Sequence, residues 1–242
     1  MCAEQTGILG TAWRIPLGVG AVFTGWLVDR YGSKRLLLID LAGCTATCLA
    51  AGLSQSYSSV FVSMLLMGCF ASIYHPAGLA LISHITTPET RGAALGWHGI
   101  FGSAGIAGAP FIAGMVFSGG DVTWKEYYLL LIIPAVTLMG VLAWRLPDIR
   151  IDHTPASLNH PTDSSHDVEN GDWGRYAILL TTGVLSGFIY AAFMHFLPRY
   201  LDDAGFVSES VSAASMRNRL AALVLSCGIV GQSVAGRLAR PR

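Results

Sequence analysis

Residues 25–35 read GWLVDRYGSKR, and this stretch decides how the rest of the chain is interpreted. It ends a long apolar run, and four charged residues then follow within seven positions, namely Asp29, Arg30, Lys34 and Arg35. A charged stop at a membrane surface needs only the basic side chains. Asp29 and the two glycines, Gly25 and Gly32, are residues that a simple anchor would not require. The stretch is therefore also a candidate for a working loop.

The composition of the chain indicates that lipid is its solvent. Of 242 residues, 52% are hydrophobic and 12% are charged, whereas a soluble globular chain carries about 25% charged residues. Basic and acidic residues number 15 each, so the net charge is zero and nothing indicates a nucleic-acid partner. The five cysteines form no C-x-x-C pair, and no metal site or disulfide framework is expected.

Seven apolar segments are each long enough to cross a bilayer as a helix, which takes roughly 17–25 residues. Their continuous apolar character favours helices over the shorter, alternating strands of a membrane barrel. The sequence therefore predicts an all-α membrane protein, a multi-pass helical bundle with about seven transmembrane helices. These helices are expected at about 7–28, 36–53, 59–83, 92–117, 124–146, 175–198 and 218–236.

The connections between these segments predict an orientation and a division of the chain. Ten Arg and Lys residues fall in one set of connections and four in the other, which places the first set in the cytoplasm and the N-terminus outside. One cytoplasmic connection, residues 147–174, is rich in Pro, Ser, Asn, Asp and His, which is typical of a flexible linker. We expect an N-terminal transmembrane bundle at 1–146 and the start of a C-terminal bundle at 175–242, in the inner membrane of a cell.

The opening stretch resembles a signature of the major facilitator superfamily (MFS) of transporters, G-x-x-x-D-R-x-G-[RK]-[RK] between helices 2 and 3. The matching residues are Gly25, Asp29, Arg30, Gly32, Lys34 and Arg35, and Ser33 departs from the usual pattern. PETRGAALG (88–96), with Arg91, resembles the loop between helices 4 and 5 of this family. GSAGIAGAPFIAG (102–114) resembles a degenerate form of the helix-5 motif of its antiporters. YHPAG (74–78) resembles members near the fosmidomycin-resistance efflux group.

The resemblance implies a fold of twelve helices with both termini inside and a long cytoplasmic loop after helix 6. The present chain is predicted to begin outside, and its long connection follows its fifth segment. These observations agree if the seven segments are family helices 2–8, so a fragment of the family fold is expected. The resemblance also implies that the loop at 29–35, together with Arg91, clamps neighbouring helices in one state of an alternating-access cycle.

Three ionisable residues inside predicted spans are candidates for contact with a substrate or a proton. Arg14 is the one charged residue in the first span. It has two alternative roles, which are contact with a substrate and snorkelling of its side chain to the outer surface. His75 and His98 lie on adjacent antiparallel segments, each roughly 9–12 Å from the inner surface. Imidazole titrates near neutral pH, which suits proton coupling. The alternative is two histidines that only hydrogen-bond in helix packing.

Prolines and glycines supply candidates for helix bends. Pro76 leaves the carbonyl of Ser72 without its helical partner. Glycines recur at 99, 102, 105 and 108. Close helix packing is the first interpretation of that stripe, and a bend at Gly105 and Pro110 is the second.

These features favour a secondary active transporter of a small organic solute or drug, coupled to protons. A seven-helix receptor is the alternative, although not a retinal pigment, because the last predicted span holds no lysine. An enzyme is not expected, since the spans hold no clustered metal ligands and no paired nucleophile and base. The sequence contains no G-x-x-x-x-G-K-[ST] loop, so it does not indicate that transport is driven by ATP. The expected partners are the lipid bilayer, a small-molecule substrate and protons, with no cofactor.

Overall fold

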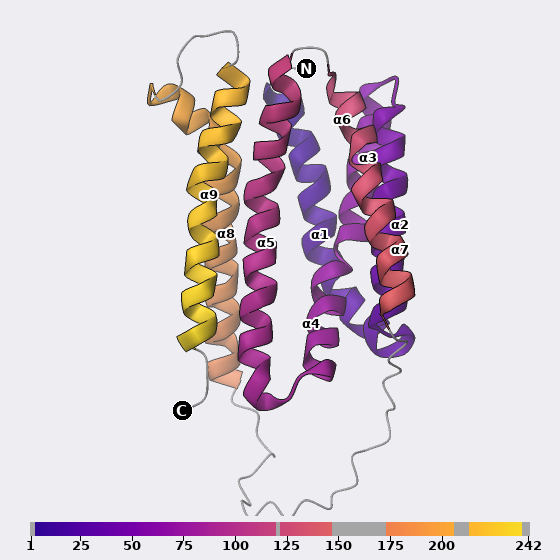
Figure 1. Cartoon of the computed structure of the whole chain (residues 1–242), viewed down its shortest axis with the longest axis vertical. Coiled ribbons are helices and arrows are strands. Elements are labelled where there is room, and N and C mark those ends of the chain that lie inside the picture. The colour runs from indigo at the N-terminus through magenta and orange to yellow at the C-terminus, as the bar shows by residue number, and fades with distance from the viewer. Residues whose placement is uncertain (1–2, 120–121, 147–172, 206–212, 239–242) are drawn as a thin grey trace, which may run out of the picture.

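The computed structural model describes residues 3–119, 122–146, 173–205 and 213–238. Over these residues the chain is a bundle of long helices that lie roughly parallel to one another, without a strand (Figure 1). The helices are α1 (Ala3–Tyr31), α2 (Ser33–Gly52), α3 (Tyr57–Ala71), α4 (Tyr74–Ile85), α5 (Pro88–Val116), α6 (Trp124–Leu130), α7 (Ile132–Arg145), α8 (Trp173–Asp203) and α9 (Ala213–Leu238). A short 3-10 turn, Phe117–Gly119, follows α5. The expected linker at 147–174 lies almost wholly outside the described residues.

Two pairs of these helices form single rods, so the described chain contains the seven rods that the sequence predicted. Helices α3 and α4 make up Tyr57–Ile85, and α6 and α7 make up Trp124–Arg145. Five rods are long and apolar enough to cross a membrane, namely Ser33–Gly52, Tyr57–Ile85, Pro88–Val116, Trp124–Arg145 and the Trp173–Met194 part of α8. Helix α9 holds a shorter apolar stretch, Asn218–Val234. The prediction of an all-α bundle is confirmed.

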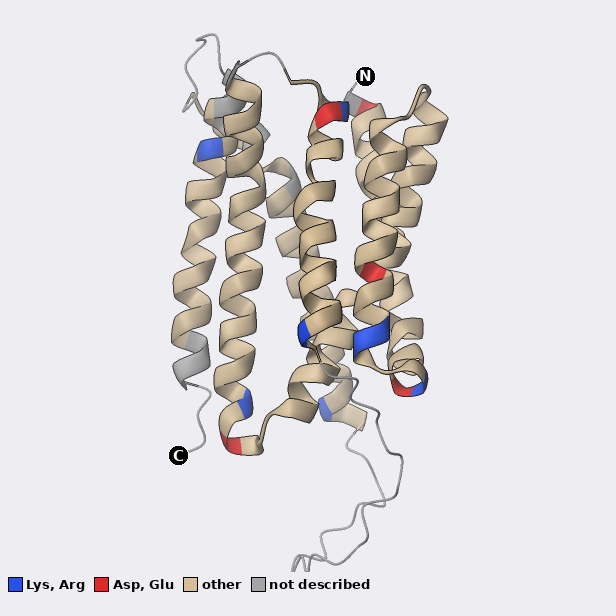
Figure 2. Ribbon diagram, turned by 45° about the vertical axis from the view of Figure 1, so that its right-hand side comes forward, with Lys and Arg blue, Asp and Glu red and all other residues tan. Residues whose placement is uncertain are grey.

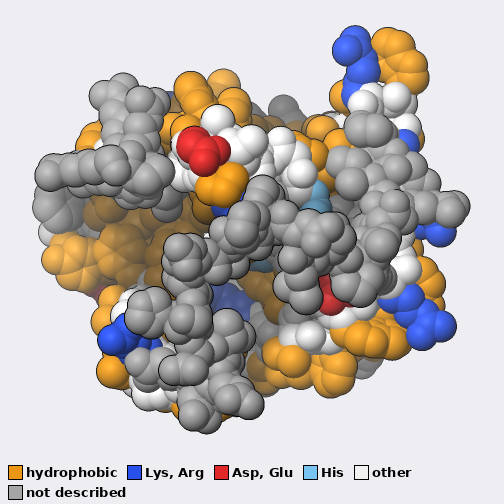
Figure 3. Space-filling view, turned by 90° about the horizontal axis from the view of Figure 1, so that it is seen from below, with side chains coloured by type: hydrophobic (Ala, Val, Ile, Leu, Met, Phe, Trp, Pro, Cys, Tyr) orange, Lys and Arg blue, Asp and Glu red, His pale blue; other side chains and the backbone are white. Residues whose placement is uncertain are grey.

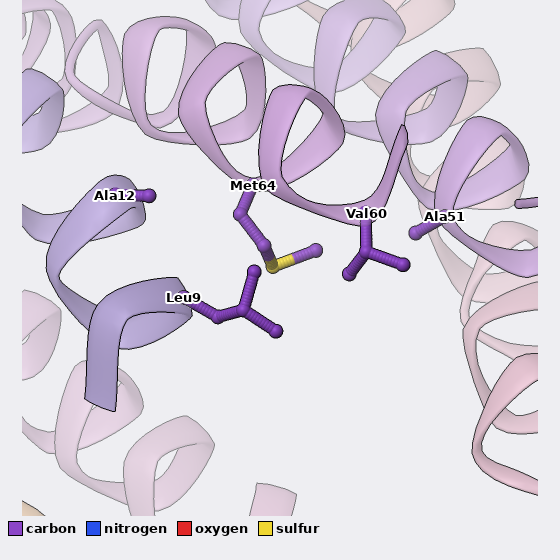
Figure 4. Close-up of a cluster of buried hydrophobic side chains, with 5 residues drawn as sticks. All are labelled: Leu9, Ala12, Ala51, Val60 and Met64. Atoms are coloured by element: carbon purple, nitrogen blue, oxygen red, sulfur yellow. The ribbon is translucent and has the colours of Figure 1, made fainter. Parts of the chain in front are cut away.

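Two hydrophobic clusters hold α1 to α4 together, one towards each end of the helices. The first joins Leu9 and Ala12 of α1 to Ala51 of α2 and to Val60 and Met64 of α3 (Figure 4). The second joins buried residues of α1, α2, α4 and the junction before α4, namely Val28, Leu36, Leu37, Ala77 and Ile73. Outside these clusters many large apolar side chains are exposed, as expected for surfaces that face lipid.

Helix α5 packs most extensively against α9, which lies more than a hundred positions later in the sequence (Figure 1). Its contact with α4, its neighbour along the chain, is much smaller. Small residues allow the close approach, because Gly99 of α5 faces the side chain of Gln232 and Gly228 of α9 faces Ser103. The packing of α5 therefore ties the first part of the described chain to the last.

Most charged residues lie towards the two ends of the rods, with long uncharged stretches of helix between them (Figure 2). Seen from the end where α4 leads into α5, basic side chains stand at several points of the rim, and histidine is visible farther in (Figure 3). This distribution follows from the cost of placing a charge at the depth of a hydrocarbon layer. The few charged residues at mid-depth are therefore the ones to examine for function.

Candidate functional site

The signature loop is a tight corner between α1 and α2. Helix α1 ends at Tyr31, and the N–H of Gly32 donates to the carbonyl oxygen of Val28 at 2.8 Å. Gly32 has φ 82° and ψ 151°, a conformation open essentially to glycine alone. Helix α2 begins at once with Ser33, which is buried. The corner is thus set by a backbone conformation that an ordinary residue would strain.

The charged residues of the corner face outward. Asp29, Arg30 and Arg35 are exposed, and Lys34 is half-buried. The guanidinium of Arg30 lies over the rings of Trp26 and Tyr31, with its Cζ 5.6 Å and 5.8 Å from the ring centroids. Such cation–π contacts fix the direction of Arg30 on the end of its own helix. Gly25, the first residue of the motif, has no neighbour within 4 Å of the position of a Cβ.

Arg91 belongs to the corner between α4 and α5. Its Nη2 donates to the carbonyl oxygen of Ser83 at 3.2 Å. Thr87 and Thr90 form a reciprocal cap at the start of α5, and Pro88 stands in the first turn. Arg91 therefore binds the end of α4 to the beginning of α5, because a basic side chain satisfies a carbonyl near the C-terminus of a helix.

Arg14 reaches from α1 across to α8. Its Nη1 donates to the carbonyl oxygen of Ala191 at 3.2 Å. Of the two alternatives for Arg14, snorkelling would instead direct the guanidinium along α1 towards the surface. The side chain is half-buried and lines a cavity of about 740 Å³ between α1, α3 and α8.

The wall of this cavity is almost wholly apolar. Aromatic side chains come from α3 and α8, namely Phe61, Phe188 and Phe196. Glu4, in the first turn of α1, is the other charged residue of the lining. A guanidinium has five N–H donors, so Arg14 retains donors beyond the bond to Ala191. The cavity thus combines aromatic surface with one cation at depth.

His75 and His98 are brought together around Tyr74. The ring of Tyr74 meets His75 edge-on, with centroids 5.2 Å apart, and stacks on His98 at 5.7 Å. The two histidines are also close enough to interact electrostatically. The structure thus brings the two predicted histidines onto one tyrosine, which the sequence analysis had not singled out.

The candidate bends behave differently from one another. The α3–α4 rod is interrupted at Ser72 and Ile73, one turn before Pro76, where the missing N–H leaves the carbonyl of Ser72 without its partner. Helix α5, in contrast, runs without interruption through both Gly105 and Pro110.

The first interpretation of the glycine stripe of α5, close helix packing, holds for one of its four glycines. A Cβ added at Gly102, Gly105 or Gly108 would meet nothing within 4 Å, so close packing does not explain these three glycines. Of the four glycines in the stripe, Gly99 is the one that another helix approaches closely. Glycines repeated every third residue drift around a helix of 3.6 residues per turn, and most of them therefore miss the contact.

Asp40 is a functional candidate that sequence reasoning overlooked. It lies in α2, is 6% exposed, and accepts a hydrogen bond from the thiol of Cys44 at 3.4 Å. It also interacts electrostatically with Tyr74, the residue that joins the two histidines. The signal was present, because an acid within the span predicted at 36–53 is as unusual as Arg14 in the first span.

Comparison with known proteins places these features in a family. The model of the Major Facilitator Superfamily matches residues 3–242. The tetracenomycin C resistance and export protein of Streptomyces glaucescens is 28% identical over 60% of this chain and 27% of its own length. The probable 4-methylmuconolactone transporter of Cupriavidus pinatubonensis is 27% identical over 88% of this chain and 49% of its own length. Multidrug resistance protein 2 of Bacillus subtilis is 24% identical over 97% of this chain and 59% of its own length.

The chain thus spans between about a quarter and three fifths of the length of these relatives. No solved structure gives a significant match. Since the family match covers almost the whole chain, the prediction of a multi-pass helical membrane protein is confirmed, and these relatives are named as transport, export or resistance proteins and not as enzymes. The chain belongs to the major facilitator superfamily.

Proposed function

We propose that this protein is a secondary active transporter that moves a small organic solute across the inner membrane by alternating access, coupled to protons. Residues 1–146 and 175–242 would belong to two bundles that rock against each other, with 147–174 as their cytoplasmic linker. Two relatives are named for organic solutes, tetracenomycin C and 4-methylmuconolactone, while a third is named for nitrate and nitrite, so the organic solute is inferred from the apolar, aromatic cavity that contains Arg14. No observation favours the alternative of a seven-helix receptor.

The cavity that contains Arg14 is the observation that carries this proposal. Its lining comes from α1 and α3 on one side of the expected linker and from α8 on the other. Solute sites of transporters lie near mid-membrane where the two repeats meet. The volume of about 740 Å³ falls within the range of roughly 300–1,000 Å³ that is typical of small-molecule sites. Aromatic walls and one guanidinium suit a solute with an apolar body and an anionic or hydrogen-bond-accepting group.

Two other features supply the remaining parts of an alternating-access cycle. The His75–Tyr74–His98 cluster offers two imidazoles, side chains that can take up and release a proton, as proton coupling requires. The rigid corner at Gly32 and the α4–α5 corner held by Arg91 lie at the same end of the bundle, where they would clamp the helices in one state. The interrupted α3–α4 rod, with Pro76, is the candidate hinge.

The test is uptake into liposomes that contain the purified chain, with and without a pH gradient. The solute panel should include aromatic carboxylates, lactones and cationic drugs. We expect Arg14→Gln to reduce uptake of the preferred solute by about tenfold or more, since one charge-assisted hydrogen bond contributes roughly 1.5–3 kcal/mol. Arg145→Gln is the matched control, because Arg145 stacks on the exposed ring of Trp144 and does not line the cavity. Wild-type uptake of every solute by Arg14→Gln would refute this site.

A further inference from the structure

We propose that Asp40 binds the coupled proton, and that Tyr74 links the charge state of Asp40 to α4 and the histidine pair. This inference rests on the proposed function, because a proton site has a transport role only in a proton-coupled transporter. It adds a residue that neither the signature motif nor the histidines had indicated.

The surroundings of Asp40 make it costly to keep charged. It is the eighth residue of α2, so it lies about 10 Å along the helix axis from the start of α2, at 1.5 Å per residue. Its side chain is 6% exposed, and α2 is packed by α1, α3, α4, α6 and α7. An unpaired carboxylate at such a position is strongly disfavoured, whereas a protonated carboxyl needs only ordinary hydrogen bonds.

Among the residues that the structure describes, no cation is a partner of Asp40. On α2 itself the thiol of Cys44 donates to Oδ1, and a thiol is a weak donor. From α4 the titratable neighbour is Tyr74. Cys48 of α2 interacts with Cys44 and also with Tyr128 of α6. Within the described parts of α1, α3, α6 and α7, no charged group interacts with the carboxyl. We therefore expect the carboxyl to be neutralised by a proton, since no cation among the described residues lies beside it to do so.

Tyr74 connects this carboxyl to the candidate hinge between α3 and α4. Its ring stacks on His98 of α5 and meets His75 edge-on, and it stands in the first turn of α4, directly after the interruption at Ser72 and Ile73. When Asp40 loses its proton, the O–H bond breaks and the electron pair stays on the carboxylate. The proton passes to water or to a neutral imidazole of the pair. The resulting carboxylate needs water that the closed packing excludes, which favours a state in which α4 moves away from α2.

Infrared difference spectroscopy of the reconstituted chain during a pH titration tests the proton site directly. We expect the band of a protonated carboxyl near neutral pH, its absence in Asp40→Asn, and its persistence in Asp203→Asn, a control at the exposed end of α8. Cys44→Ala should keep the band and shift its frequency, because one hydrogen bond to the carboxyl is removed. Identical spectra for wild type and Asp40→Asn would overturn the proposal, and this measurement requires no transport.

Transport then tests the role of the proton. We expect Asp40→Asn to lose the solute accumulation that a pH gradient drives, while it retains exchange of labelled solute without a gradient. Asp40→Glu should restore part of the accumulation, because it returns a carboxyl to the site. Accumulation at the wild-type level in Asp40→Asn would contradict the coupling role.

If the wild type moves no solute in the panel, the proposed function fails, and the infrared result still decides whether Asp40 binds a proton. If Asp40→Asn does not fold, Asp40→Glu and Cys44→Ala carry the infrared test, and an unchanged band in both would refute the assignment.

Discussion

Single glycines of α1, α2 and α3, namely Gly20, Gly43 and Gly68, stand where neighbouring chain segments touch, whereas three glycines of α5 face open space. A Cβ at Gly43 would fall on the ring of Phe70, and a Cβ at Gly68 would fall on the backbone oxygen of Trp13. At Gly102, Gly105 and Gly108 a Cβ would meet nothing within 4 Å. Yet it is the α5 set that forms a regular pattern in the sequence.

The difference shows what a glycine pattern can and cannot indicate. Close approach depends on which helix lies opposite, and that partner is chosen by the whole fold and not by local spacing. Gly68 and Gly43 are single glycines with no motif around them, but each one meets the body of another helix. Substitutions at the two sets should therefore have opposite consequences for stability, which Gly68→Val and Gly105→Ala test, while Gly32→Ala tests a glycine required for its backbone conformation.

The largest effect is expected for Gly68→Val. A side chain at this position would collide with the backbone of α1 at Trp13, which cannot rotate away as a side chain can. Helices α1 and α3 would have to separate, at a cost of about 3 kcal/mol in the free energy of unfolding. Denaturant titration in detergent micelles, followed by circular dichroism, measures this change. Unfolding at the wild-type midpoint would show that the α1–α3 contact is not as close as described.

A smaller loss is expected for Gly32→Ala, where the reason for glycine is conformation and not space. The residue adopts φ 82° and ψ 151° in the corner between α1 and α2. For a residue with a Cβ, this backbone conformation costs roughly 1–3 kcal/mol of folding free energy. Gly25→Ala is the matched control from the same motif, since it is helical and has open space around it. The same unfolding assay should separate the two variants. Equal stability of the two would mean that the corner does not depend on Gly32.

The smallest effect, with the opposite sign, is expected for Gly105→Ala. The residue is in the interior of a continuous helix and has no neighbour to displace. Alanine should therefore raise the stability by about 0.5–1 kcal/mol, since it loses less conformational freedom than glycine on folding. A rise in the apparent Tm, together with unchanged uptake, is the expected outcome. A clear destabilisation would indicate that a helix packs against this face in another state.

Much of the fold could be predicted from the sequence because crossing a membrane requires a fixed length of apolar helix. The span predicted at 36–53 corresponds to α2 (Ser33–Gly52), and the span at 59–83 corresponds to the α3–α4 rod. The interruption of that rod at Ser72 and Ile73 was signalled by Pro76. A second interruption, at Leu131 between α6 and α7, lies three residues before Pro134, a comparable signal that had not been used.

The candidate site was less accessible to prediction because it depends on contacts between helices. Depth along a helix can be counted, and this placed His75 and His98 at one level. The ring of Tyr74 between them and the partner of Arg14 on α8 depend instead on how helices rotate and pack. Asp40 was a different case, since its unusual position could have been noticed from the sequence alone.

The hydrogen bond between Arg14 and α8 has one more consequence, for genetics. Its acceptor is the main-chain oxygen of Ala191 and not a side chain. Small substitutions at position 191 that preserve the helix, such as Ala191→Ser, therefore leave the acceptor in place, whereas larger side chains would enter the cavity that Ala191 lines. The hydrogen bond would therefore be revealed by substituting Arg14, and not by a small substitution of Ala191.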